Sequence, residues 1–157
     1  MYRHGPSGPE VLLVHPGGPF FARKDAGAWS IPKGEVSPDE RDFEQTARRE
    51  FEEEVGHPVP ARELIPLGWI RQKSGKIVHA WAVEGDIDTS TMSSNMIELR
   101  WPPFGKKRSW PEVDRWVYYA EAEARRYIKD TQAPLLDRLY EALSENAAPP
   151  GTPSEGE

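Results

Sequence analysis

The stretch from Gly34 to Gly56 constrains this chain more than any other part of its sequence. Its second half contains Glu50, Glu53 and Glu54, at positions i, i+3 and i+4, which share one face of an α-helix. Three neighbouring carboxylates repel one another, so a folded protein keeps them where a cation, nearby arginines or full hydration offsets the charge. The first compensation predicts a metal site, whereas the other two describe an ordinary hydrated surface.

An apolar stripe on the same segment helps to decide between these readings. Phe43, Ala47, Phe51 and Val55 recur every four residues, which predicts the buried face of an amphipathic helix. On a helical wheel the three glutamates fall within about 80° of Phe43. They therefore border the buried stripe, whereas a purely hydrated acidic face would lie opposite it. The pattern favours a cation site.

The charge of the whole chain supports a local site. The 157 residues carry a net charge of −6, and residues 39–54 alone hold eight acids and three arginines, a net of −5. No long basic face is evident, which argues against duplex nucleic acid as a partner. The chain has no cysteine, no apolar run near the roughly 20 residues that span a bilayer and no apparent signal peptide. We therefore expect a cytoplasmic protein without a membrane partner.

Short apolar runs bounded by Gly and Pro predict strands at 1–3, 11–14, 29–31, 64–70, 77–83, 96–101 and 116–119. The long helix is expected to start near Ser37-Pro38 and to end at Gly56, and two further helices are expected at 120–128 and 134–143. Residues 102–109 are predicted to be a basic loop. Residues 1–145 should form one domain, followed by a disordered acidic tail at 146–157. Strands on both sides of a long helix indicate an α/β sandwich.

The segment Arg49-Glu50-Phe51-Glu52-Glu53-Glu54-Val55-Gly56, with Gly34 and Glu40 before it, resembles the sequence box of the Nudix hydrolase family. That box is a Gly, five residues, a Glu, seven residues, then Arg-Glu-apolar-x-Glu-Glu-x-Gly and an apolar residue. Here eight residues separate Glu40 from Arg49, and His57 stands at the last apolar position. The resemblance implies a Nudix-type α/β/α sandwich, with a mixed β-sheet and the box helix packed on it. Relatives usually have a full strand before residue 1, so the first strand here is expected to be shortened.

The resemblance also extends beyond the box. The lead-in at 29–35 is similar to that of nucleoside-polyphosphate hydrolases, including relatives that hydrolyse diadenosine polyphosphates. The run at 101–128 resembles a family of predicted bacterial NTP pyrophosphohydrolases. Such enzymes cleave a nucleoside diphosphate linked to another group, X, with Mg²⁺ or Mn²⁺, which favour carboxylate oxygens and bridge them to phosphate.

By this resemblance, the metal ligands would be Glu50, Glu53 and Glu54, with the carbonyl of Gly34 as a further ligand. Arg49 would pair with the carboxylates and hold their rotamers. For Glu40, a role at the metal and a place on the ordinary surface are both open, because of the extra residue before Arg49.

The general base has several candidates. In some relatives it is a box glutamate, which matches Glu50 or Glu53, and in others it is a glutamate on a later loop. Here the loop candidates are Glu112 and then Glu98. Substrate phosphates could be contacted by basic residues at four positions, namely Lys33, Lys106, Lys107 and Arg108.

The sequence leaves three functions open. The first is a Mg²⁺-dependent pyrophosphohydrolase acting on NTPs or on dinucleoside polyphosphates such as diadenosine tetraphosphate. The second is a non-catalytic nucleotide-binding or sensor domain on the same scaffold. The third is a Nudix hydrolase of a non-nucleotide diphosphate such as a diphosphoinositol. The box contacts the diphosphate and the metal, so it does not specify X. We expect a monomer or a homodimer.

Overall fold

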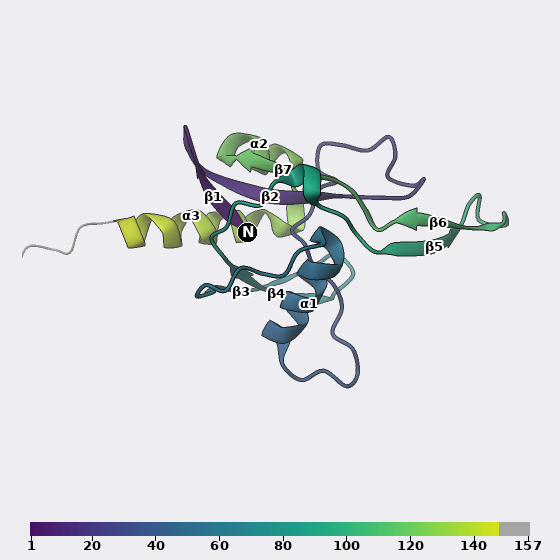
Figure 1. The fold of residues 1–157 in the computed structure, drawn as a ribbon, viewed down its shortest axis with the longest axis horizontal. Helices are drawn as coiled ribbons and strands as arrows, with labels where there is room; N and C mark the ends of the chain where they lie inside the picture. Colours follow the sequence, from purple (N-terminus) through teal and green to yellow (C-terminus); the bar gives the residue numbers. More distant parts are fainter. Residues whose placement is uncertain (148–157) are drawn as a thin grey trace, which may run out of the picture.

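The computed structural model describes residues 1–147. The elements, in chain order, are β1 (Tyr2–Gly5), β2 (Gly8–Pro16), α1 (Phe43–Val55), β3 (Ile65–Arg71), β4 (Ile77–Ala82), β5 (Met96–Arg100), β6 (Lys107–Pro111), β7 (Val113–Ala120), α2 (Glu121–Tyr127) and α3 (Ala133–Ala147), with 3₁₀ turns at Thr89–Thr91 and Asp130–Gln132. Figure 1 shows α1 on one side of the strands and α2 on the other. Residues 148–157 of the predicted acidic tail lie outside the described residues.

The strands form three small antiparallel sheets. One contains β1, β2 and β7 in that order, and the other two are the hairpins β3–β4 and β5–β6. An isolated parallel bridge between Tyr2 and Glu84 connects β1 to the residues that follow β4, with hydrogen bonds from Tyr2 N–H to the Val83 carbonyl and from Gly85 N–H to the Tyr2 carbonyl. The strands therefore include both antiparallel and parallel pairings, and with the helices they make up an α/β sandwich.

Alternation along β2 divides the core between the two sides of its sheet. Leu13 packs with Trp29 and with Leu136 of α3, whereas Leu12 packs with Phe51 of α1. Successive side chains of a strand point to opposite faces, so one buried strand serves both layers. The apolar run at 11–14 predicted this strand, and the structure extends it to nine residues.

Helix α1 begins at Phe43, so the start that the sequence predicted near Ser37-Pro38 is wrong. Ser37 and Glu40 form a separate turn, in which Glu40 N–H donates to the Ser37 carbonyl at 2.9 Å. Asp42 is extended and its side chain accepts hydrogen bonds from the backbone N–H groups of residues 44 and 45, which caps the helix. Gly56 ends the helix at φ 79°, in the left-handed conformation that glycine tolerates, as expected.

Two other segments differ from the sequence predictions. Residues 107–109, expected in a basic loop, belong to β6, because Lys107 and Arg108 pair with Arg100 and Leu99 of β5. Residues 29–31 make isolated bridges only, from Ser30 to Val14 and from Trp29 to Ile128. The remaining predicted strands and helices are present, with ends that shift by a few residues.

Candidate active site

Arg49 holds three carboxylates at one side of α1. Its Nε and Nη2 donate to the two carboxylate oxygens of Glu40 at 2.8 and 3.0 Å. Its Nη1 lies 3.0 Å from Oε1 of both Glu50 and Glu53. The pKa of Glu40 is lowered to about 2, mainly by the bidentate hydrogen bond from Arg49. Glu40 therefore reaches the arginine of the box despite the extra residue between them.

Two of the box carboxylates are buried. Glu50 is 8% exposed and Glu54 is 7% exposed. Burial raises the pKa of Glu54 to about 8, against the hydrogen bond that Lys33 N–H donates to its Oε2 at 3.1 Å. Burial also raises the pKa of Glu50, opposed by the charge of Arg49. Burial disfavours the charged form of both carboxyls, so a proton or a cation must compensate each of them.

Gly34 lies directly against one of these carboxylates. A Cβ atom at this position would lie 1.7 Å from Cδ of Glu50, far inside van der Waals contact. Only glycine allows the backbone to come so close. Together with the bond from Lys33 N–H to Glu54, this contact places the backbone of residues 33–34 against both buried carboxylates.

A chain of backbone hydrogen bonds brings Glu112 to the same place. Asn95 N–H donates to the Glu53 carbonyl, and Glu112 N–H donates to the Asn95 carbonyl, both at 2.9 Å. Burial and the negative charge of Glu53 raise the pKa of the Glu112 carboxyl. Glu112 thus joins the three box glutamates in one acidic cluster, although it is 58 residues from the nearest of them, Glu54, in sequence.

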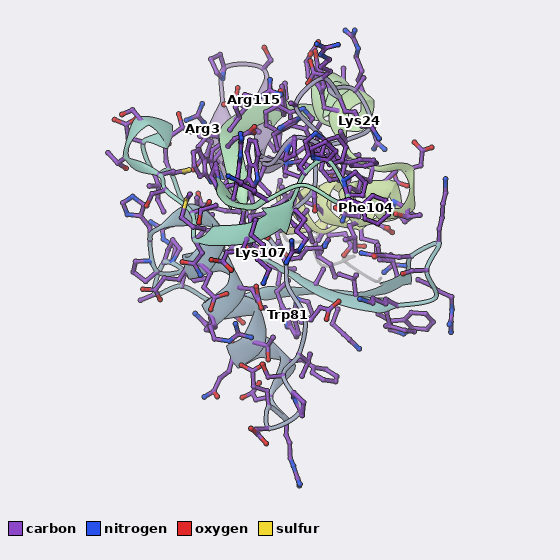
Figure 2. All side chains as sticks on the ribbon, turned by 90° about the vertical axis from the view of Figure 1, so that its right-hand side faces the viewer. Arg3, Lys24, Trp81, Phe104, Lys107 and Arg115 are labelled. Carbon is purple, nitrogen blue, oxygen red and sulfur yellow. The ribbon has the colours of Figure 1, made fainter. Side chains whose placement is uncertain are left out.

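The basic residues expected near the substrate lie in two separate parts of the structure. Lys33 lies beside the carboxylates. In contrast, Lys106, Lys107 and Arg108 are exposed on the β5–β6 hairpin, which projects away from α1 (Figure 1). Figure 2 looks at this hairpin end-on, with Lys107 labelled on it. Glu98 is likewise exposed on β5, so among the later candidates only Glu112 joins the cluster.

Sequence reasoning missed Lys129, which follows α2. Its backbone N–H donates to the carbonyl of Trp29 at 2.9 Å, on the segment that leads to Lys33. Burial lowers the pKa of Lys129, and the charge of Lys33 lowers it further while that of Glu54 raises it. No motif marks this lysine. The only available signal was the predicted helix before it, which did not show where the next residue would lie.

A cavity of about 480 Å³ lies behind the Lys33–Gly34 segment, under α1. Its walls are mostly apolar and include Phe51 of α1, Ala82 of β4 and Leu136 of α3. Such a lining suits an apolar or aromatic group and offers little to a phosphate chain.

The donors of the acidic cluster fit a hard divalent cation. All are oxygens, and the chain contains no cysteine, which matches the preference of Mg²⁺ and Mn²⁺. Within residues 1–147 no three acidic, histidine or cysteine side chains form a ready-made ion cage. Arg49 engages Glu50 and Glu53 instead, and the backbone of Lys33 engages Glu54.

Comparison with protein families decides what kind of protein carries this cluster. The family model of the NUDIX domain matches residues 3–139. The chain belongs to the Nudix family. The resemblance to the Nudix family noted in the sequence is thereby confirmed. No curated protein is similar enough in sequence to match the chain.

Solved structures confirm the Nudix fold. The NUDIX domain of Shewanella oneidensis NrtR, complexed with ADP ribose, has a TM-score of 0.63 at 16% identity, over 90% of this chain and 82% of that one. A C. elegans Ap4A hydrolase has a TM-score of 0.62 at 21% identity, over 92% and 94% of the two chains. The E. coli ORF135 protein has a TM-score of 0.56 at 22% identity, over 94% and 90%.

None of the helices within residues 1–147 is both long enough and apolar enough to cross a membrane.

Proposed function

We propose that this Nudix protein is a divalent-cation-dependent pyrophosphohydrolase that cleaves a phosphoanhydride bond in nucleoside polyphosphates, either NTPs or dinucleoside polyphosphates. The observation that carries the proposal is the buried carboxylate of Glu54, whose pKa is raised to about 8 beside a second buried carboxylate, Glu50. A bound cation would compensate the charges of both carboxylates in place of protons. The polyphosphate substrate class rests on the sequence resemblance and is supported by the fold shared with an Ap4A hydrolase.

In this proposal Glu50, Glu53 and Glu54 hold Mg²⁺ or Mn²⁺, with the Gly34 carbonyl as a further ligand. When bound, the cation neutralises phosphate charge and lowers the pKa of an attacking water. Arg49 orients the carboxylates, and the side chain of Lys33 binds a phosphate oxygen.

Glu112 accepts the proton of the attacking water. The water oxygen bonds to phosphorus as the bridging P–O bond breaks, and the departing phosphate takes the bond's electron pair. The raised pKa of Glu112 suits this role, because a base works best when its pKa approaches the working pH.

The substrate can be identified by incubating the protein with Mg²⁺ and a panel of candidates in ¹⁸O-labelled water. The panel contains NTPs, oxidised dNTPs, diadenosine tetraphosphate, ADP-ribose and a diphosphoinositol. Mass analysis of the product pair identifies X, and the position of the label identifies the phosphorus that was attacked. We expect turnover of an NTP or of the dinucleoside polyphosphate.

The catalytic cluster is tested by Glu53→Gln and Glu54→Gln, each of which removes a charge with little change in shape. We expect turnover to fall at least about 100-fold in both while the proteins stay folded. Glu52→Gln is the matched control, because Glu52 lies on the same helix with an exposed side chain. Unchanged turnover in both cluster variants would contradict the proposal.

A second candidate is nucleotide binding without turnover. One observation favours it, the similar fold of a NUDIX domain complexed with ADP ribose. Calorimetric binding of ADP-ribose with Mg²⁺ present, together with no product from any substrate in the panel, would support this function over hydrolysis.

A further inference from the structure

Lys129 is fixed beside the segment that carries Lys33. Trp29 N–H donates to the Tyr127 carbonyl at 3.1 Å, and Lys129 N–H donates back to the Trp29 carbonyl at 2.9 Å, around a parallel bridge between Trp29 and Ile128. Residues 127–129 therefore run alongside Trp29. The residues that follow Trp29 lead to Lys33 and to the carboxylate cluster.

The electrostatic surroundings of the Lys129 side chain include a positive group, Lys33, and a negative group, Glu54. Lys129 is half-buried. Burial and then the charge of Lys33 lower its pKa, and the charge of Glu54 raises it. Among residues 1–147, neither lysine takes part in a salt bridge within 4.0 Å. Lysines whose ammonium groups form no ion pair with the protein can bind the phosphate groups of a substrate that reaches the carboxylate cluster beside Lys33.

The Lys129 side chain also lies near the loop that carries Phe21 and Lys24. Its Nζ lies 5.8 Å from the centroid of the Phe21 ring, and Nζ of Lys24 lies 5.6 Å from the same ring. The ring nitrogens of the buried His15 lie 2.6 Å from the Lys24 carbonyl oxygen and 2.7 Å from Oδ1 of Asp114. These contacts attach the loop that carries Phe21 and Lys24 to β2 and β7.

We propose that Lys129, acting with Lys33, binds the phosphate groups that lie beyond the cleaved bond, so that the site favours chains of three or more phosphates over a diphosphate. The inference rests on the proposed function, because it concerns the same substrate chain. The carboxylate cluster acts at the cleaved bond, and the two lysines act on the phosphates next to it. Lys129 is therefore a specificity-determining residue.

The test compares inorganic tripolyphosphate with pyrophosphate by calorimetry, with Mg²⁺ present, on Lys129→Met, Lys129→Arg and the wild type. We expect Lys129→Met to weaken tripolyphosphate binding about 10-fold or more and pyrophosphate binding less than about 3-fold, as for one charge-assisted hydrogen bond. Lys129→Arg should retain the preference. Lys73→Met is the control, since Lys73 is exposed in the β3–β4 turn, and it should bind both anions like the wild type.

A second measurement needs no variant. The folded wild-type protein is acetylated briefly with and without tripolyphosphate, and modified lysines are identified by peptide mass. We expect tripolyphosphate to protect Lys129 and to leave Lys73 unprotected. Equal weakening of both anions by Lys129→Met, or unchanged acetylation of Lys129, would overturn the inference.

The two proposals can fail separately. If the wild type selects tripolyphosphate through Lys129 but hydrolyses no nucleotide, the proposed function is wrong and the phosphate site stands. If it hydrolyses nucleotides and Lys129→Met keeps the wild-type preference, the inference about Lys129 is wrong and the proposed function stands.

Discussion

Arg49 donates to both carboxylate oxygens of Glu40, nine residues earlier in the chain, from Nε at 2.8 Å and from Nη2 at 3.0 Å. Its remaining nitrogen, Nη1, lies 3.0 Å from both Glu50 and Glu53. Glu40 therefore fixes the guanidinium plane, and the guanidinium in turn fixes two glutamates of the cluster. The extra residue between Glu40 and Arg49 does not break this pairing, because residues 41–42 precede α1 and are not helical.

We predict that Glu40→Gln and Arg49→Lys lower kcat by roughly 10- to 100-fold with smaller changes in KM, because lysine cannot make the bidentate bond and glutamine has only one acceptor. Steady-state kinetics on the substrate identified by the panel measures this effect. Glu44→Gln is the control, since Glu44 forms an exposed i,i+4 pair with Arg48 on the same helix. If Glu44→Gln reduced kcat as much as Glu40→Gln, the positioning role of Glu40 would be refuted.

The buried Glu54 predicts a pH dependence of stability in the absence of metal. Its pKa rises from an ordinary 4.5 to about 8 on folding, so the folded state binds more protons between these values. The free energy of unfolding should therefore fall as pH rises from about 4.5 to about 8, with a loss of roughly 2–4 °C in Tm for each kcal/mol at this chain length. Thermal unfolding in a chelator from pH 5 to pH 8 measures it.

The Glu54→Gln variant isolates this contribution. Its Tm should fall less between pH 5 and pH 8 than that of the wild type, and Mg²⁺ at pH 8 should raise its Tm less. Glu52→Gln should follow the wild-type curve, because its side chain is exposed. Parallel curves for Glu54→Gln and the wild type would show that burial of this carboxylate does not control the pH response.

Glu112 is predicted to be the general base. Glu112→Gln should lower kcat by about 10²- to 10⁴-fold and leave KM within a few-fold, as expected for the loss of proton transfer. Glu98→Gln is the matched comparison, since Glu98 lies exposed on the hairpin just before Glu112. The pH–rate profile of the wild type should lose its acidic limb in Glu112→Gln, and an acidic limb that persists would reassign the base to a glutamate of the box.

The cap of α1 predicts a change in stability. Asp42→Ala removes the side-chain acceptor of two backbone N–H groups at the helix start, and should cost about 1 kcal/mol. Asp42→Asn should lose much less. Denaturant unfolding measures the difference, with Asp39→Ala as control because Asp39 is exposed in the preceding turn. A larger loss in Asp39→Ala than in Asp42→Ala would place the helix start nearer to the sequence prediction.

The sequence predicted α1 and its acidic border because side-chain periodicity is a local property. It misplaced the start of the helix because Ser37 and Asp42 are both good cap residues, and the choice depends on Arg49, which engages Glu40 and so keeps the turn at 37–40 separate. Strand β6 was missed because it begins with the charged Lys107 and Arg108 and its residues do not alternate between polar and apolar. It forms by pairing with β5, which is a contact between segments.

The cluster was predicted in part for the same reason. The box glutamates lie within one helix, so their spacing places them together. Glu112 was a candidate among several, and its distance from Glu53 depends on the backbone of Asn95. The position of Lys129 depends on the bridge between Trp29 and Ile128, and no sequence pattern in either segment predicts that bridge.

The connection through Asn95 has a consequence for how this site can vary. It uses only the N–H and C=O groups of residue 95, and the Asn95 side chain is exposed. Nineteen of the amino acids supply the same two groups, and only proline lacks the N–H. Residue 95 can therefore be any amino acid except proline while the backbone hydrogen bonds that connect Glu53 to Glu112 are kept. A search for the site by matching side chains would overlook the residue that joins its two halves.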